Sequence, residues 1–142
     1  MTLAEALWTV PAERMKAGRE HRVPLSKSAV KLLRSLPKGA PDDLVFPGLR
    51  GPISDMSLTA VLRRMGVDAT VHGFRSTFGD WCSERTSHAS EVAEMALAHA
   101  VGDKVEAAYR RGDLFEKHVL LMNDWARFLE AMKPRCRGNR AP

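Results

Sequence analysis

Five side chains of this sequence are of the types that break and re-form phosphodiester bonds without a metal ion. They are Lys16, His72, Arg75, His99 and Tyr109. A tyrosine hydroxyl can attack phosphorus as a nucleophile, while cationic and imidazole groups neutralise charge and move protons around the reacting phosphate. The five residues are therefore the first hypothesis for a catalytic set, and no metal or other cofactor is expected.

Each of these side chains, taken alone, has a simpler structural explanation. Lys16 in a polar loop is normally solvated, and an HxxR pair such as His72 and Arg75 most often lies on a solvated helix face. At helical spacing, His99 shares a face with apolar residues, and so does Tyr109, which favours burial in a core. Only the combination and order of the five residues favours chemistry.

The elements expected around these residues are mainly helices. Residues 7–10 and 21–25 are typical of short strands, and the polar segment between them predicts a hairpin loop that carries Lys16. Residues 37–56 are rich in proline and glycine and predict a loop. Helices are expected at about residues 26–36, 57–66, 71–84, 91–99, 103–111 and 113–132. The predicted fold class is mainly α with a small β-hairpin at the N-terminus, that is, α+β.

Capping residues indicate where several of these helices begin and end. Ser26 and Ser57 can each begin a helix, and Gly66 suits the position after a helix end. Thr70 is expected to cap the next helix. That cap places His72 in a first turn, where free backbone N–H groups and the helix dipole favour an anion.

Two of the expected helices have a clear apolar face. In residues 71–84, Phe74, Phe78 and Trp81 share one face, and the HxxR pair lies opposite. Residues 113–132 carry an apolar stripe that must pack against this domain or against a neighbouring protomer. The stripe consists of Leu114, His118, Leu121, Trp125, Phe128 and Met132.

The composition fits one globular domain. The chain has 142 residues, of which 44% are hydrophobic, and it lacks the run of about 18 apolar residues that crosses a membrane. Its N-terminus lacks the residue order of a signal peptide, so cytoplasmic residence is expected. Cys82 and Cys136 do not have the spacing of a zinc site or of a disulfide framework.

Basic residues are clustered along the chain, whose net charge is +5. They predominate between Arg14 and Arg34, and again in residues 133–142, a tail that is expected to be disordered. Clusters of this kind attract polyanions such as nucleic acids. Charge alone is equally consistent with a solvated surface.

Taken together, the motifs resemble the tyrosine recombinase (phage integrase) family. MKAGREHRVPLS is similar to the family's lysine hairpin, HGFR to its HxxR box, and LAHAVGDKVEAAYRRGD to its histidine-to-nucleophile segment. The resemblance covers about residues 7–129 and implies a partial recombinase catalytic domain at residues 1–132. It also implies double-stranded DNA as a partner, and contact with other recombinase protomers through the C-terminal helix.

The resemblance assigns a role to each of the five residues. Tyr109 would attack a DNA phosphate and leave a 3′-phosphotyrosyl link, which conserves bond energy and allows rejoining without ATP. Arg75 and His99 would stabilise charge on the phosphate oxygens. His72 would accept the tyrosine proton or bind the phosphate, and Lys16 would protonate the departing 5′ oxygen. Contacts to the DNA backbone are expected for Arg14, Arg19, Arg22 and Arg110.

One part of the family pattern has no counterpart in this sequence. Family members carry a further arginine, in a G-x-R-x-x-E segment upstream of the lysine hairpin, whereas the residues before the first expected strand contain no arginine. The chain is therefore expected to be truncated at its N-terminus and to lack the family's N-terminal DNA-binding domain. Loss of one such charge donor costs on the order of 10²- to 10³-fold in rate. We accordingly expect little or no recombination, and enzymatic activity stays open.

A second hypothesis is a non-catalytic remnant that binds DNA through the basic hairpin or docks on a full-length recombinase through the C-terminal stripe. It requires no intact catalytic set. A helical structural domain without either role explains the composition but not the ordered motifs.

Overall fold

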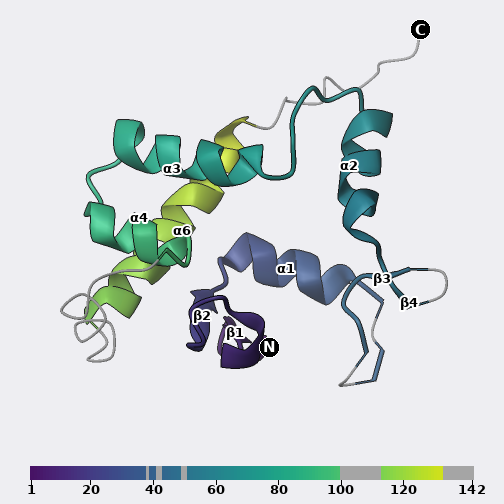
Figure 1. The fold of residues 1–142 in the computed structure, drawn as a ribbon. Coiled ribbons are helices and arrows are strands. Elements are labelled where there is room, and N and C mark those ends of the chain that lie inside the picture. The colour runs from purple at the N-terminus through teal and green to yellow at the C-terminus, as the bar shows by residue number, and fades with distance from the viewer. Residues whose placement is uncertain (38, 41–42, 49–50, 100–112, 133–142) are drawn as a thin grey trace, which may run out of the picture.

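The computed structural model of the chain describes residues 1–37, 39–40, 43–48, 51–99 and 113–132 (Figure 1). In chain order the elements are β1 (Leu7–Val10), a 3₁₀ turn (Ala12–Arg14), β2 (His21–Pro24), α1 (Lys27–Ser35), β3 (Pro47–Gly48), β4 (Gly51–Pro52), α2 (Asp55–Arg64), α3 (Gly73–Arg85), α4 (Ser90–Ala96) and α6 (Asp113–Met132). The described residues are mainly helical with small antiparallel sheets, so the predicted α+β class is confirmed. The helix expected at 103–111 and the tail at 133–142 lie outside the described residues.

The N-terminal hairpin has the predicted strands. β1 and β2 pair antiparallel, with Leu7 opposite Pro24 and Val10 opposite His21. The loop between them contains the 3₁₀ turn and then Gly18, whose φ of 61° lies in the left-handed region that glycine adopts without strain. The loop that carries Lys16 is therefore a defined turn at the end of a short ribbon.

The first two helices begin at serines. The Ser26 hydroxyl accepts a hydrogen bond from the Ala29 N–H at 3.2 Å, as predicted for a cap. The prediction for α2 was wrong by two residues, because its cap is Ser54 and the helix begins at Asp55. Ser57 lies inside the first turn, and its hydroxyl is hydrogen bonded to that of Ser54.

The loop predicted at 37–56 contains a second, very small sheet. β3 and β4 pair antiparallel, with Gly48 opposite Gly51. Figure 1 shows this pair and α2 on the opposite side of α1 from α3, α4 and α6. Met56 and Leu58 of α2 and Met65 just after it are exposed, so few apolar side chains of other elements pack on this helix.

The core lies where α3, α4 and α6 pack together. Its buried residues are Phe78, Trp81 and Cys82 of α3, Val92 and Met95 of α4, and Leu114 and Leu121 of α6. The apolar stripe of α6 thus packs within this chain, although Met132 at its end is exposed. The prediction that Phe74 belongs to the core was wrong: it is 54% exposed, because burial on α3 begins one turn later, at Phe78.

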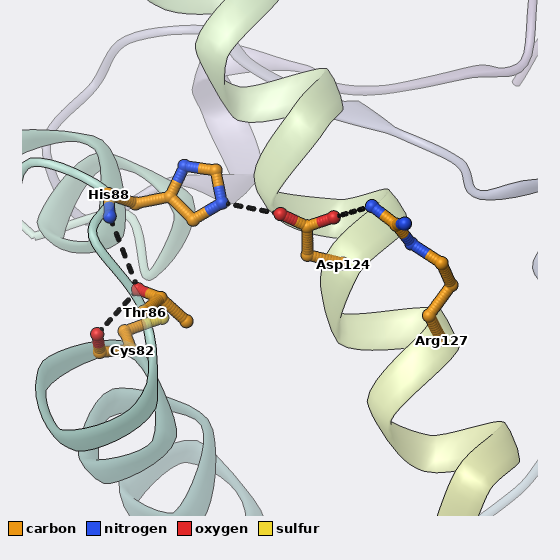
Figure 2. Close-up of polar contacts among 5 residues, drawn as sticks. All are labelled: Cys82, Thr86, His88, Asp124 and Arg127. Carbon is orange, nitrogen blue, oxygen red and sulfur yellow. Dashed lines mark hydrogen bonds and ion pairs between the residues drawn. The ribbon is translucent and has the colours of Figure 1, made fainter.

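A polar chain ties the loop after α3 to α6 (Figure 2). The Thr86 hydroxyl donates to the Cys82 carbonyl at 2.6 Å, and the His88 ring nitrogen Nε2 lies 2.8 Å from a carboxylate oxygen of Asp124. Arg127 binds the other oxygen of that carboxylate. The pKa of Asp124 is lowered, chiefly by the hydrogen bond with His88 and further by Arg127. The end of α3 is thereby held against the middle of α6.

A buried imidazole pair joins the hairpin to α6. The side chain of His118 is fully buried, and among the described residues neither ring nitrogen has a hydrogen-bond partner. Its ring stacks on that of His21, the first residue of β2, with 6.4 Å between ring centroids. The Arg22 guanidinium lies over the Phe115 ring, 4.4 Å from its centroid. Two neighbouring residues of β2 therefore contact the first turns of α6.

Burial and charge lower the proton affinity of this pair. Burial, and to a smaller extent the charge of the nearby His21, lowers the pKa of His118 to about 4. Burial also lowers the pKa of His21, against the opposing effect of a hydrogen bond to the Ala96 backbone. The docked hairpin therefore favours neutral imidazoles. None of the described helices is long and apolar enough to span a membrane.

We predict that His118→Leu removes most of the acid sensitivity of folding. The His118 pKa is about 4 in the folded chain and near 6.5 in the unfolded one, so protons bind preferentially to the unfolded chain. The stabilising contribution of the neutral ring is complete above about pH 6.5 and is lost as the pH falls toward 4. It amounts to about 2 kcal/mol between pH 7 and pH 5. Urea unfolding followed by circular dichroism at both pH values measures it.

A matched control is Leu121→Met, a change of similar volume at the neighbouring buried position of α6. It should cost less than about 1.5 kcal/mol at both pH values and leave the pH dependence in place. If His118→Leu loses as much stability between pH 7 and pH 5 as the parent chain, another group accounts for the acid sensitivity.

Candidate functional site

The hairpin loop presents Lys16 to solvent. Lys16 is exposed, as are Arg14 and Arg19 in the same loop. Arg22 is half-buried, and its guanidinium packs on Phe115 at the contact between β2 and α6. The loop thus offers a cluster of cationic side chains at the tip of an element whose base is anchored.

His72 and Arg75 lie at the start of α3. The helix begins at Gly73 with His72 as its N-cap residue, so His72 precedes the first turn in which it was predicted. The predicted capping hydroxyl of Thr70 does accept a hydrogen bond from the Gly73 N–H, at 3.0 Å. His72 is exposed and Arg75 is half-buried at this end of the helix. The helix dipole and a guanidinium together favour an anion here.

His99 lies outside the helix in which it was expected. α4 ends at Ala96, and Ala98 adopts a left-handed conformation with φ 53°. The N–H of Ala98 donates to the Met95 carbonyl at 2.9 Å, and the N–H of His99 donates to the Glu94 carbonyl at 2.9 Å. These two bonds form a Schellman motif, which ends the helix and turns the chain away from its axis.

That turn also corrects the expectation that His99 is a packed core residue. Its side chain is 43% exposed, because the left-handed residue before it takes the chain off the apolar face of α4. The ring nitrogen Nδ1 of His99 is hydrogen bonded to a carboxylate oxygen of Glu94. The imidazole is therefore accessible and held from one side.

The elements that carry these residues pack on one another. α3 packs against α4, and both α4 and β2 pack against α6. The backbone of Ala96, three residues before His99, lies close enough to His21, five residues after Lys16, to oppose the lowering of the His21 pKa. The base of the lysine hairpin therefore adjoins the end of the helix that precedes His99. Tyr109 and Arg110 lie outside the described residues.

Two features of the site were not expected from the sequence. Glu94 is five residues before His99, a spacing that does not place two side chains on one helix face, so only the turn at Ala98 brings them together. An open pocket lined in part by Arg85 and Phe128 lies apart from these residues, and no predicted catalytic residue lines it. Among the described residues, no group of three His, Cys, Asp or Glu side chains could hold a metal ion.

Known proteins of one kind match this chain. Residues 1–114 match the phage integrase family. Prophage integrase IntA of Escherichia coli K12 is 33% identical over 130 residues, which are 87% of this chain and 31% of that protein. Prophage integrase IntZ of the same strain is 33% identical over 137 residues, 93% of this chain and 34% of that protein. The integrase of Enterobacteria phage P4 is 31% identical over 147 residues, 89% and 34% respectively.

The chain therefore spans about a third of the length of these relatives. No solved structure matches it.

We predict that Ala98→Gly stabilises the chain. A residue with a Cβ atom in the left-handed region is strained by about 1 kcal/mol, and glycine relieves this strain at a helix end. The greater freedom of glycine in the unfolded chain offsets part of the gain, so the free energy of unfolding should rise by up to about 1 kcal/mol. Urea unfolding measures the difference.

The reverse control is available at the end of α2. Gly66 occupies the same position of a Schellman motif, with φ 66°, and an added Cβ atom would meet nothing within 4 Å. Gly66→Ala should therefore destabilise the chain by about 1 kcal/mol through backbone strain alone. If Ala98→Gly and Gly66→Ala changed the free energy of unfolding by the same amount in the same direction, this explanation would be contradicted.

Proposed function

Because the chain belongs to the phage integrase family, we propose that it cleaves and rejoins DNA strands through Tyr109 in site-specific recombination, at a low rate because no arginine of this sequence matches the family's G-x-R-x-x-E segment. The observation that carries the proposal is that the family match at residues 1–114 includes the lysine hairpin, the HxxR box, His99 and Tyr109. The packing of β2 and α3 with α4 and α6 supports it, since these elements carry or precede the proposed catalytic residues.

In the proposed reaction, the Tyr109 oxygen forms a bond to phosphorus, and the bond from phosphorus to the 5′ oxygen breaks. The 3′ phosphate stays on the tyrosine. Free tyrosine has a pKa of about 10, so the attack near neutral pH needs a proton acceptor, a role that we assign to His72. Lys16 gives a proton to the departing 5′ oxygen. The reverse sequence rejoins the strand without ATP.

We assign to two residues the role of stabilising the negative charge that develops on the phosphate. Arg75 can donate two parallel hydrogen bonds to the non-bridging oxygens, and the N-terminal end of α3 adds its dipole. His99 is exposed just after the end of α4 and, when its ring carries a proton on each nitrogen, can donate a further hydrogen bond from Nε2. Donors of this kind, fixed before the reaction, stabilise the transition state because they need little reorganisation.

Double-stranded DNA is the proposed substrate, held in part by Arg14 and Arg19 of the exposed loop. The relatives named as integrases are about three times as long as this chain, so other parts of such proteins can contribute to binding. We also propose contacts between protomers through the exposed end of α6, where Leu129 and Met132 face solvent.

We predict that Tyr109→Phe abolishes a covalent protein–DNA adduct. Tyr109 is the only tyrosine of the chain, so no other tyrosine can serve as nucleophile. A nicked suicide substrate, from which the 5′ fragment diffuses away, accumulates the adduct, which denaturing gel electrophoresis detects. Ser76→Ala, at an exposed position on the same helix as Arg75, is the control and should retain the adduct.

Two results would count against the assignment. An adduct that survives Tyr109→Phe would exclude Tyr109 as the nucleophile. Salt-dependent DNA binding by the parent chain with no adduct at all would favour the alternative, a non-catalytic DNA-binding or partner-binding remnant.

We predict that the effect of Lys16→Ala on the cleavage rate depends on the leaving group of the substrate. Lys16→Ala should slow adduct formation by on the order of 10²-fold or more, because a 5′ oxygen needs a proton to leave. Replacing that oxygen by sulfur makes the leaving group a good one without a proton, so the variant should then cleave at close to the parent rate. Single-turnover rates on the two substrates measure the difference.

Arg14→Ala in the same loop is the matched control. If Arg14 only binds backbone phosphate, its loss should weaken the binding of both substrates to the same extent. Failure of sulfur to restore the Lys16→Ala rate would assign Lys16 to binding instead of proton transfer.

A further inference from the structure

We propose that Glu94 is a positioning residue that fixes the His99 imidazole with Nδ1 directed to the helix end and Nε2 directed to the substrate. The inference rests on the proposed function of His99 as a donor to the reacting phosphate. Glu94 lies outside the HxxR box and outside the segment from Leu97 that contains His99, on α4 two residues before the helix ends.

Glu94 holds His99 at two points. The Glu94 carbonyl accepts the backbone N–H of His99 at 2.9 Å, and the Glu94 carboxylate accepts a hydrogen bond from Nδ1 of the His99 ring. The first bond fixes the start of the side chain, and the second fixes its tip. One residue thereby restrains both the backbone and the ring of another.

This restraint matters because His99 is exposed. The His99 and Glu94 side chains are 43% and 52% exposed, so no surrounding core fixes the ring. A free imidazole on the surface samples several rotamers, and holding it in one costs conformational entropy at the moment of reaction. A hydrogen bond already present in the free protein reduces that cost.

The same bond decides which nitrogen is available. When Nδ1 carries the proton given to the carboxylate, Nε2 is the free position of the ring, and on protonation it becomes the outward donor. The Glu94 carboxylate then lies on the far side of the ring from Nε2. Its negative charge is separated from the proposed phosphate by the imidazole.

The left-handed turn at Ala98 is what makes this arrangement possible. In a continued helix, residues 94 and 99 would point away from each other. With φ 53° at Ala98, the chain reverses and places the His99 side chain beside Glu94. The strained conformation of Ala98 is therefore what orients the His99 side chain.

The decisive measurement is the protonation state of each ring nitrogen by ¹⁵N NMR of the full chain labelled at histidine, with His99→Gln used to assign the signal. In the parent chain at a pH where the ring is neutral, His99 should be found with the proton on Nδ1. Glu94→Ala should shift it to the tautomer with the proton on Nε2. Glu94→Gln should retain the parent tautomer, because its amide oxygen accepts the same bond.

Glu91→Ala is the matched control, since Glu91 is an exposed acid one turn earlier on α4. It should change neither the tautomer nor the rate. A parent chain with the proton of His99 on Nε2, or a tautomer unchanged by Glu94→Ala, would overturn the proposal.

Adduct formation on the suicide substrate links the pairing to the reaction. Glu94→Ala should lower the single-turnover rate by about 10-fold, with DNA affinity unchanged, and Glu94→Gln should restore most of it. A rate unaffected by Glu94→Ala despite the tautomer shift would overturn the positioning role. If the parent chain forms no adduct through Tyr109, the proposed function fails, while the NMR signature still decides whether Glu94 orients His99.

Discussion

The packing of α6 against α3 and α4 holds the rest of the structure in place. The Trp81 and Trp125 rings lie 4.9 Å apart between α3 and α6, and Leu121 is fully buried beside them. Burial of large aromatic and aliphatic groups is the main stabilising contribution in so small a chain. This packing also fixes the position of α3, and with it the N-terminal end of the helix, where Arg75 lies. The His88–Asp124 contact adds a polar restraint to the same pair of helices.

The hairpin depends on this core through a different kind of contact. His21 stacks on the buried ring of His118, and Arg22 packs on Phe115. These contacts bury polar groups as well as apolar area, so they contribute less than packing of purely apolar side chains would. The location of Lys16 therefore depends on an interface that is stable while its imidazoles are neutral. The location of Arg75 depends on the aromatic core.

The sequence predicted those parts of the molecule that follow helical periodicity or a strong local signal. Phe78 and Trp81 are buried because a spacing near 100° per residue places them on one face. Gly66 was recognised as a helix end because glycine is the usual left-handed residue. Ala98 could not be recognised, since alanine favours the helix interior and only tertiary packing selects its left-handed conformation. The position of His99 outside α4 and its pairing with Glu94 follow from that residue and were missed with it.

The buried His118 ring has a consequence for kinetics. The pH dependence of an enzyme rate is usually assigned to the groups that exchange protons with the substrate. In this chain the contact that holds the lysine hairpin favours a neutral imidazole in the scaffold, away from the proposed reacting groups. The acid limb of a pH–rate profile would therefore report the docking of a structural element as well as the chemistry, and a single apparent pKa from that limb would belong to both.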